Sequence, residues 1–283
     1  LYTLGLLYLE QKDFKSAEPL IKKLLAVPER SEEASYFMGQ IYEGLQQPKP
    51  ALDAYKRASV GRYARESTVR IAALLKDTDS LAAARAWLAE QIKSSSDERK
   101  VLLWQVDGQL LHDAGQYPPA IASFGQALAI KADDSDVLYS RALSAEKAGD
   151  FAASEKDLQA VLKLQPDNAM VLNALGYMLV VNTQRYPEAV ELIDKALKVR
   201  PDDPAIMDSM GWVLFRTGKL EEAESWLRKA YNLLPDPEVA SHLVEVLLAR
   251  GNKAEAKAIL DTMLGKFPDD KLLLPLKAKL VDA

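Results

Sequence analysis

One stretch of the sequence occurs as two similar, consecutive copies, and it decides the fold. Residues 169–201 read AMVLNALGYMLVVNTQRYPEAVELIDKALKVRP, and residues 204–235 read PAIMDSMGWVLFRTGKLEEAESWLRKAYNLLP. Equivalent residues in the two copies lie 34 or 35 positions apart, and they include Gly176 and Gly211, Ala189 and Ala223, and Pro201 and Pro235. A fixed period of this length indicates one supersecondary unit that is repeated and stacked.

The same period extends along the whole chain. The glycine position recurs as Gly5, Gly39, Ala72, Gly108, Ala142, Gly176, Gly211 and Val244. About a dozen residues after each of these, a second series runs Ala17, Ala51, Ala84, Ala120, Ser154, Ala189, Ala223 and Ala256. A small residue in each of two successive helices lets them cross closely, and a larger side chain there would cost about 1–3 kcal/mol. The period therefore predicts eight pairs of helices.

Turn and terminus signals separate the predicted helices. Glycine stands where the first helix of a pair should end, at Gly115, Gly149, Gly218 and Gly251, and favours a left-handed C-cap. Proline follows the second helix at Pro166, Pro201, Pro235 and Pro268. Because proline cannot continue a helix and the aspartates near it can cap the next one, each repeat begins and ends at a defined place.

Composition excludes several classes of function. The 283 residues are 48% hydrophobic and 27% charged, which is typical of a folded chain, and the net charge of −5 gives no basic stripe for nucleic acid. There is no cysteine, and no apolar run reaches the roughly 18 residues of a membrane span. The chain begins inside a helix pattern, so we expect it to be part of a longer protein, with any signal peptide or lipid attachment upstream.

The residues of known catalytic motifs are missing. His112 and His242 are the only histidines, neither belongs to an HExxH motif, and no glycine-rich stretch matches a phosphate-binding loop. We therefore expect no enzymatic activity, no cofactor and no metal site. Both histidines are predicted to be ordinary surface residues.

The repeats resemble the tetratricopeptide repeat (TPR), a helix-turn-helix unit. The resemblance implies an all-α superhelical solenoid of about eight antiparallel helix pairs with a capping helix at the C-terminus. The array is predicted over residues 1–268 and the cap over 269–283, where Leu272, Leu273 and Leu274 are expected to be buried. The predicted repeats are 1–30, 31–64, 65–98, 101–134, 135–168, 169–203, 204–236 and 237–268. The polar spacer KSSSDE at 93–98 lengthens the period and is a predicted hinge.

The resemblance also implies a binding groove lined by the first helix of each pair, helix A. The lining residues lie three before the helix-A glycine, one after it, and four or five after it, and Met170 lies one turn earlier on the same face. They are predicted to be Met170, Asn173, Tyr177, Asp208, Trp212 and Arg216, together with Tyr139, Gln105 and Gln109. An apolar and aromatic wall with a few polar side chains suits an extended peptide with hydrophobic anchors. In the alternative interpretation Tyr177, Trp212 and Phe215 only pack against the neighbouring helix A.

One TPR subtype does not fit. Chaperone-binding TPR domains hold a C-terminal carboxylate with Lys, Arg and Asn on successive helices A. The equivalent positions here are largely Tyr, Gln, Ser, Val and Asp, with Arg70 as the isolated base. A partner of that kind is not expected.

The sequence of residues 169–248 resembles those of bacterial outer-membrane TPR lipoproteins that act as adaptors of a periplasmic carboxyl-terminal processing protease. That resemblance implies a non-enzymatic adaptor in the cell envelope, whose partners are the protease and its protein substrates. Two alternatives remain at this point. The chain could be a cytoplasmic TPR subunit of another complex, or an array that associates with itself.

Overall fold

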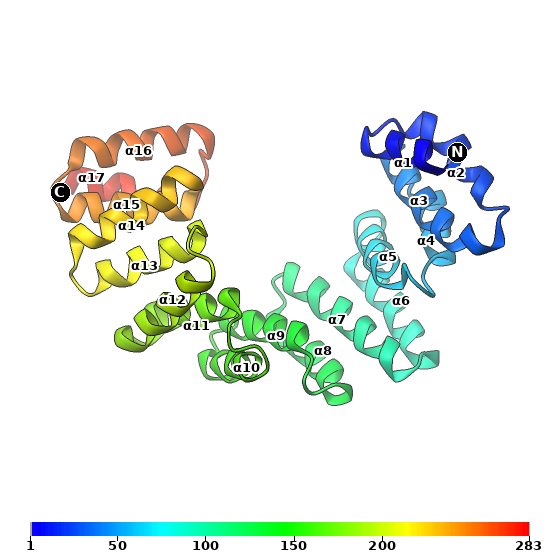
Figure 1. Cartoon of the computed structure of the whole chain (residues 1–283), viewed down its shortest axis with the longest axis horizontal. Helices are drawn as coiled ribbons and strands as arrows, with labels where there is room; N and C mark the ends of the chain where they lie inside the picture. Colours follow the sequence, from blue (N-terminus) through cyan, green and yellow to red (C-terminus); the bar gives the residue numbers. More distant parts are fainter. Residues whose placement is uncertain (1, 283) are drawn as a thin grey trace. The chain divides into compact units, whose positions relative to one another are not determined.

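The computed structural model describes residues 2–282, and every regular element among them is a helix (Figure 1). The elements are α1 (Tyr2–Glu10), α2 (Phe14–Leu24), the short 3-10 helix η1 (Pro28–Arg30), α3 (Ser31–Gly44), α4 (Pro48–Arg57), α5 (Ala64–Thr78), α6 (Leu81–Ser94), α7 (Asp97–Asp113), α8 (Tyr117–Ile130), α9 (Ser135–Lys147), α10 (Phe151–Leu164), α11 (Ala169–Asn182), α12 (Tyr186–Val199), α13 (Pro204–Arg216), α14 (Leu220–Leu233), α15 (Pro237–Ala249), α16 (Lys253–Lys266) and α17 (Leu276–Asp282). The predicted all-α class is confirmed. None of the described helices is both long and apolar enough to cross a lipid bilayer.

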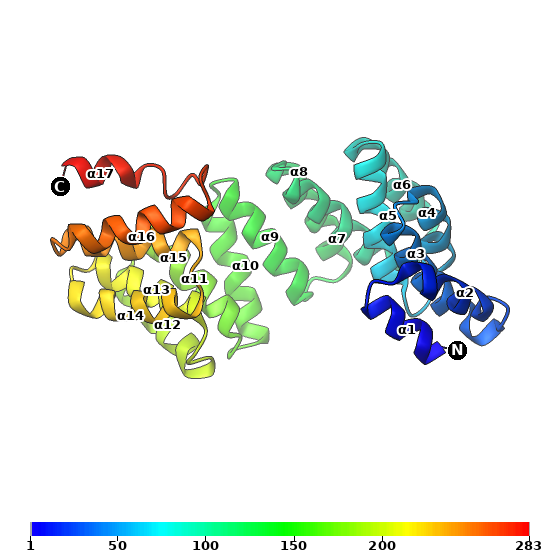
Figure 2. The ribbon, with the colours of Figure 1, turned by 90° about the horizontal axis from the view of Figure 1, so that it is seen from above.

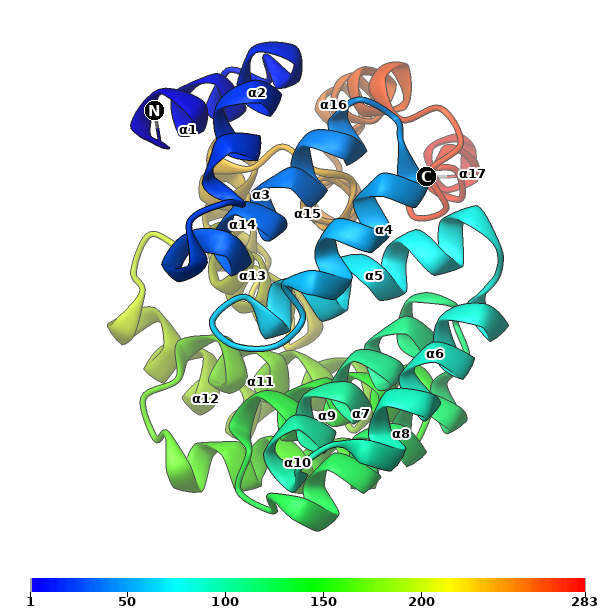
Figure 3. The ribbon, with the colours of Figure 1, turned by 90° about the vertical axis from the view of Figure 1, so that its right-hand side faces the viewer.

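The helices form two compact units, one ending at Ala148 and the other beginning at Gly149. In the N-terminal unit, consecutive helices pack as pairs, and Figure 3 shows α3 beside α4 and α5 beside α6. In the C-terminal unit the pairs are α11 with α12, α13 with α14, and α15 with α16, and α17 lies against α15 and α16 (Figure 2). The spacer at 93–98, predicted to be a hinge, lies inside the N-terminal unit.

The repeated glycines lie where two helices of a pair cross. A Cβ atom added to Gly211 would lie 2.5 Å from Cγ of Leu227 and 3.2 Å from the carbonyl oxygen of Ala223. Gly176 has the same environment, with Ile193 at 2.7 Å and the carbonyl oxygen of Ala189 at 3.2 Å. The glycine therefore receives the large side chain four residues after the alanine of the second helix. The same relation joins Gly5 to Ile21, Gly39 to Tyr55, and Gly108 to Phe124.

Helix ends follow the local sequence. Helices α10, α12, α14 and α16 each end two residues before a proline, at Leu164, Val199, Leu233 and Lys266. The next helix is then capped by a side-chain oxygen that accepts a backbone N–H, as Asp203 does for α13 and Asp236 for α15.

The C-terminal leucines are only partly as expected. Leu273 is fully buried, whereas Leu272 and Leu274 are 50% and 40% exposed. The prediction that all three are buried is wrong, because residues 271–275 form turns rather than a helix that could present one continuous face.

Three turns between paired helices place a residue other than glycine in the left-handed region. Gly218 has φ +81°, as the sequence predicts, but the equivalent turn after α11 uses Gln184 at φ +59°. The other two are Lys12 and Gln46. An L-residue with a Cβ atom pays about 1–2 kcal/mol for this conformation.

Gln184→Gly is therefore expected to raise the free energy of unfolding by about 1 kcal/mol, since the left-handed strain is removed. Urea denaturation followed by circular dichroism measures the change. Gln184→Ala is the control, because alanine keeps the Cβ atom and should give no gain. Equal stabilisation by both variants would show that backbone strain is not the cause.

Candidate functional site

Successive helices A of the C-terminal unit present a shared face. On α11, Met170, Asn173, Tyr177 and Val181 are spaced three or four residues apart, so they lie along one side of the helix. The matching row on α13 contains Asp208 and Trp212, and α13 packs against both α11 and α15. Because the period is preserved, residues at equal positions of neighbouring repeats come next to each other on this face.

A buried histidine–aspartate pair lies at the centre of the face. Nδ1 of His242 on α15 is 2.9 Å from each carboxylate oxygen of Asp208 on α13. Since a carboxylate only accepts hydrogen bonds, the imidazole donates from Nδ1. Asp208 is 5% exposed, and burial raises the pKa of its carboxyl group, although the bond from His242 acts in the opposite direction.

Aromatic side chains cover this pair. The indole of Trp212 stacks on the His242 ring, with centroids 4.1 Å apart and planes 20° apart, and Phe215 lies 5.2 Å from the indole. The Tyr177 hydroxyl donates to Oε1 of Glu238 at 3.0 Å, which connects α11 to α15. Tyr177, Trp212 and Phe215 are all half-buried. Packing between neighbouring helices A, the alternative drawn from the sequence, therefore accounts for much of their surface.

Two expectations are corrected here. Asp208 is not an accessible groove residue, because its carboxylate is buried and occupied by His242. His242 is not a surface residue, because it lies beneath Trp212. His112 is partly buried, and its Nδ1 lies 2.8 Å from Oγ of Ser144. The sequence contained a signal for the contact between Asp208 and His242, because these residues are 34 positions apart, one period of the repeat.

An apolar surface remains open on α11. Met170 is 49% exposed and Val181 is 44% exposed, at the two ends of the row. Between them lies Asn173, whose Oδ1 atom is buried and has no hydrogen-bond partner among the described residues. A buried acceptor without a partner is costly, and because this atom is covered by its neighbours it lies beneath the open surface rather than on it. Arg216, at the end of α13, is exposed and donates to the Tyr186 hydroxyl at 3.2 Å.

Of the predicted groove residues in the N-terminal unit, Gln105 and Gln109 line one pocket of about 250 Å³ between α5 and α7, whereas Tyr139 is not among its lining residues. Gln105 accepts two hydrogen bonds from the Arg65 guanidinium, at 3.1 and 2.8 Å. Gln109 is exposed and donates to Asp113 on its own helix at 2.7 Å. Tyr139 is half-buried, and burial raises the pKa of its hydroxyl.

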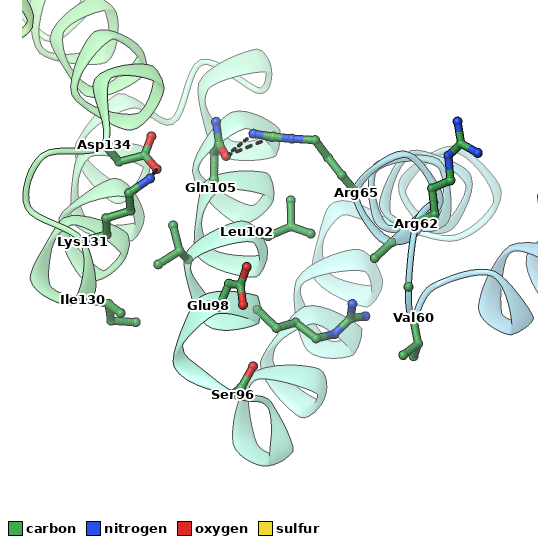
Figure 4. Close-up of a pocket in the computed structure, with 14 residues that line it drawn as sticks. Val60, Arg62, Arg65, Ser96, Glu98, Leu102, Gln105, Ile130, Lys131 and Asp134 are labelled. Atoms are coloured by element: carbon green, nitrogen blue, oxygen red, sulfur yellow. Dashed lines mark hydrogen bonds and ion pairs between the residues drawn. The ribbon is translucent and has the colours of Figure 1, made fainter.

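A pocket that the sequence did not predict lies in the N-terminal unit (Figure 4). It has a volume of about 640 Å³ and is bordered by the starts of α5 and α7 and by the loop before α9. Its cationic side chains are Arg62, Arg65, Arg99 and Lys131. These four residues lie in inter-repeat loops and first turns, whereas Gln105, a predicted groove residue of helix A, also lines the pocket. Among residues 2–282, no group of three or more histidine and carboxylate side chains could hold a metal ion.

Comparison with known families agrees with the helix pairs. A tetratricopeptide repeat model matches residues 2–67, 106–169, 139–204 and 178–238, and a second tetratricopeptide repeat model matches 214–280. Together these matches cover most of the chain. The protein belongs to the tetratricopeptide repeat family. Proteins of this family bind other proteins or peptides, and both matching models describe a structural repeat rather than a catalytic domain.

Relatives share the repeat over different lengths. The TPR repeat-containing protein PA4667 of Pseudomonas aeruginosa is 38% identical over 217 residues, which are 75% of this chain and 36% of that protein. The chain thus spans about a third of that relative. A tetratricopeptide repeat protein from Parabacteroides merdae superposes with a TM-score of 0.65 at 14% identity, over 90% of this chain and all of the other. PilW, a type IV pilus biogenesis factor, superposes with a TM-score of 0.62 at 17% identity, over 76% of this chain and 99% of PilW. These two likenesses concern the fold alone.

Proposed function

We propose that this protein is an adaptor that brings protein substrates to a carboxyl-terminal processing protease in the bacterial cell envelope. The observation that carries the binding role is the open row on α11. There, two apolar side chains on the same side of the helix, Met170 and Val181, are 49% and 44% exposed. Exposed apolar side chains along one helix suit the hydrophobic anchors of a peptide segment.

The choice of partner rests on the similarity of residues 169–248 to envelope TPR lipoproteins that serve such a protease. In this proposal the TPR array holds the protease or its substrate and performs no chemistry itself. The same proposal places the full-length protein at the outer membrane. A signal peptide with a lipid-attachment cysteine in the upstream gene sequence would support this location, and a gene that lacks both would contradict it.

Degradation in a purified system tests the adaptor role. The full-length protein is mixed with the processing protease of the same cell and one of its cell-wall hydrolase substrates, and loss of substrate is followed on gels. The protein is expected to accelerate degradation. Equal rates with and without it would refute the adaptor role.

The double variant Met170→Glu, Val181→Glu is expected to slow the assisted degradation about tenfold, since charge on both anchors opposes burial against a peptide. Both side chains are nearly half exposed, so the melting temperature should change little. Val199→Glu is the matched control, because Val199 is 46% exposed but lies at the end of α12, the second helix of its pair. A double variant as active as the wild type would exclude the α11 row as the binding surface.

A further inference from the structure

Three of the residues that line the unpredicted pocket are arginines, Arg62, Arg65 and Arg99. Arg65 is hydrogen-bonded to the neutral amide of Gln105, and Arg62 lies over the Tyr63 ring at 5.6 Å. Arg99 is half-buried, and burial lowers the pKa of its guanidinium. None of the three forms an ion pair within the part of the chain that the structure describes. This differs from Arg70 and Arg85 in the same unit, which are bonded to carboxylates.

The lining as a whole is positive although the chain is negative. It carries four cationic side chains and two carboxylates, Glu98 and Asp134, and Asp134 is already paired with Lys131 at 3.0 Å. Figure 4 shows Arg62 and Arg65 on one side of the pocket and the Lys131–Asp134 pair on the other, with Glu98 and Gln105 on α7 between them. The chain itself has a net charge of −5. A local excess of cations on an acidic protein draws an anionic group to this place in particular.

Two helix ends border the pocket, the first turns of α5 and α7, and neither helix has a side-chain cap on its first N–H groups. The positive end of a helix dipole favours anions, but Glu66 on α5 and Asp97 and Glu98 on α7 already offset it here. The arginines, rather than these ends alone, define the site.

The remaining lining is aliphatic. Val60 and Ile130 are exposed at opposite borders of the pocket, and Leu102 lies between them on α7. A volume of about 640 Å³ is within the usual range for ligand sites. A nucleic acid would need a continuous basic stripe, whereas this pocket is small, partly aliphatic and contains carboxylates. A short peptide with acidic and aliphatic side chains matches both parts of the lining.

We propose that this pocket binds an acidic segment of a partner protein, with carboxylates held by Arg62, Arg65 and Arg99 and an aliphatic side chain against Leu102. Arginine suits this role because its planar guanidinium bonds a carboxylate through two parallel N–H groups. The site lies in the N-terminal unit and is independent of the α11 row and of the protease proposed above as partner, so either proposal can fail without the other.

Fluorescence anisotropy with a defined peptide tests the site. The probe is a fluorescein-labelled, C-terminally amidated peptide of sequence GDLDLDG, titrated with the whole chain in about 50 mM salt. Binding is expected, and Arg99→Gln should raise Kd about tenfold or more. Arg57→Gln is the matched control, since Arg57 is exposed at the end of α4 and does not line the pocket, and it should leave Kd unchanged.

Each other result has a defined meaning. If Arg99→Gln does not fold by circular dichroism, Arg65→Gln decides, because Arg65 is exposed. Wild-type affinity in the deciding variant would overturn the proposal. Equal binding of the peptide GNLNLNG, in which no carboxylate remains, would also overturn it. Binding of an oligothymidylate of equal charge as tightly as the acidic peptide would show a general polyanion site instead.

Discussion

Gly211→Leu is expected to lower the free energy of unfolding by about 3 kcal/mol, the upper end of the usual cost of overpacking. The added Cβ atom would lie 2.5 Å from Cγ of Leu227 and 3.2 Å from the carbonyl oxygen of Ala223. The first contact involves a fully buried side chain, and the second involves the backbone of the partner helix. Neither can move without separating α13 from α14. Urea unfolding, followed by circular dichroism and by tryptophan fluorescence from the adjacent Trp212, measures the loss.

Gly265→Leu is the matched control for this prediction. Gly265 lies inside α16, and a Cβ atom added there would meet nothing within 4 Å. Leucine should therefore stabilise the helix by up to about 1 kcal/mol through its higher helix propensity. If Gly211→Leu unfolded at the same urea concentration as the wild type, the helix crossing would not depend on this glycine.

The fold was predictable because its signals are local or periodic. Proline after a helix, aspartate before one and glycine at a crossing each act within a few residues or within one helix pair. The α10, α12, α14 and α16 termini and the Asp203 and Asp236 caps follow from these signals. The left-handed backbone of Gln184 could not be predicted from such signals, because nothing in the sequence marks a non-glycine residue with positive φ.

The candidate sites were less predictable, for two different physical reasons. On the helix-A face the period could have paired Asp208 with His242, but helical spacing alone does not show how far each helix is rotated toward its neighbour. Only the structure shows that Trp212 covers the pair. The arginine pocket draws on loops before α5 and α9 and on the start of α7, where spacing is irregular and the period gives no guide.

His242→Phe is expected to lower the free energy of unfolding at neutral pH by about 3 kcal/mol. The phenyl ring keeps the aromatic contact with Trp212, but it leaves the Asp208 carboxylate buried with no donor, and a buried charge that loses its partner is strongly destabilising. Urea unfolding at pH 7.5 measures this. His112→Phe is the matched control: His112 also bonds a residue of the next helix A, but its partner is the neutral hydroxyl of Ser144, so the loss should be near 1 kcal/mol.

The pH dependence of the same variant separates charge from packing. Burial raises the pKa of Asp208 above its ordinary value of 3.8, so the folded state binds this proton more tightly than the unfolded state. The contribution of the Asp208 carboxyl group to stability is then greatest below about pH 4. This contribution is lost as pH rises through the folded pKa, because the charged form is the one that burial disfavours. His242→Phe removes the hydrogen bond that opposes this rise in pKa. The variant should therefore lose less unfolding free energy, relative to the wild type, at pH 4.5 than at pH 7.5. Asp208→Asn added to His242→Phe removes the titrating group, and the difference between the two pH values should disappear. If His242→Phe loses the same unfolding free energy at both pH values, the histidine stabilises the helix-A face by packing. The Asp208 carboxyl group would then not be charged in the folded protein.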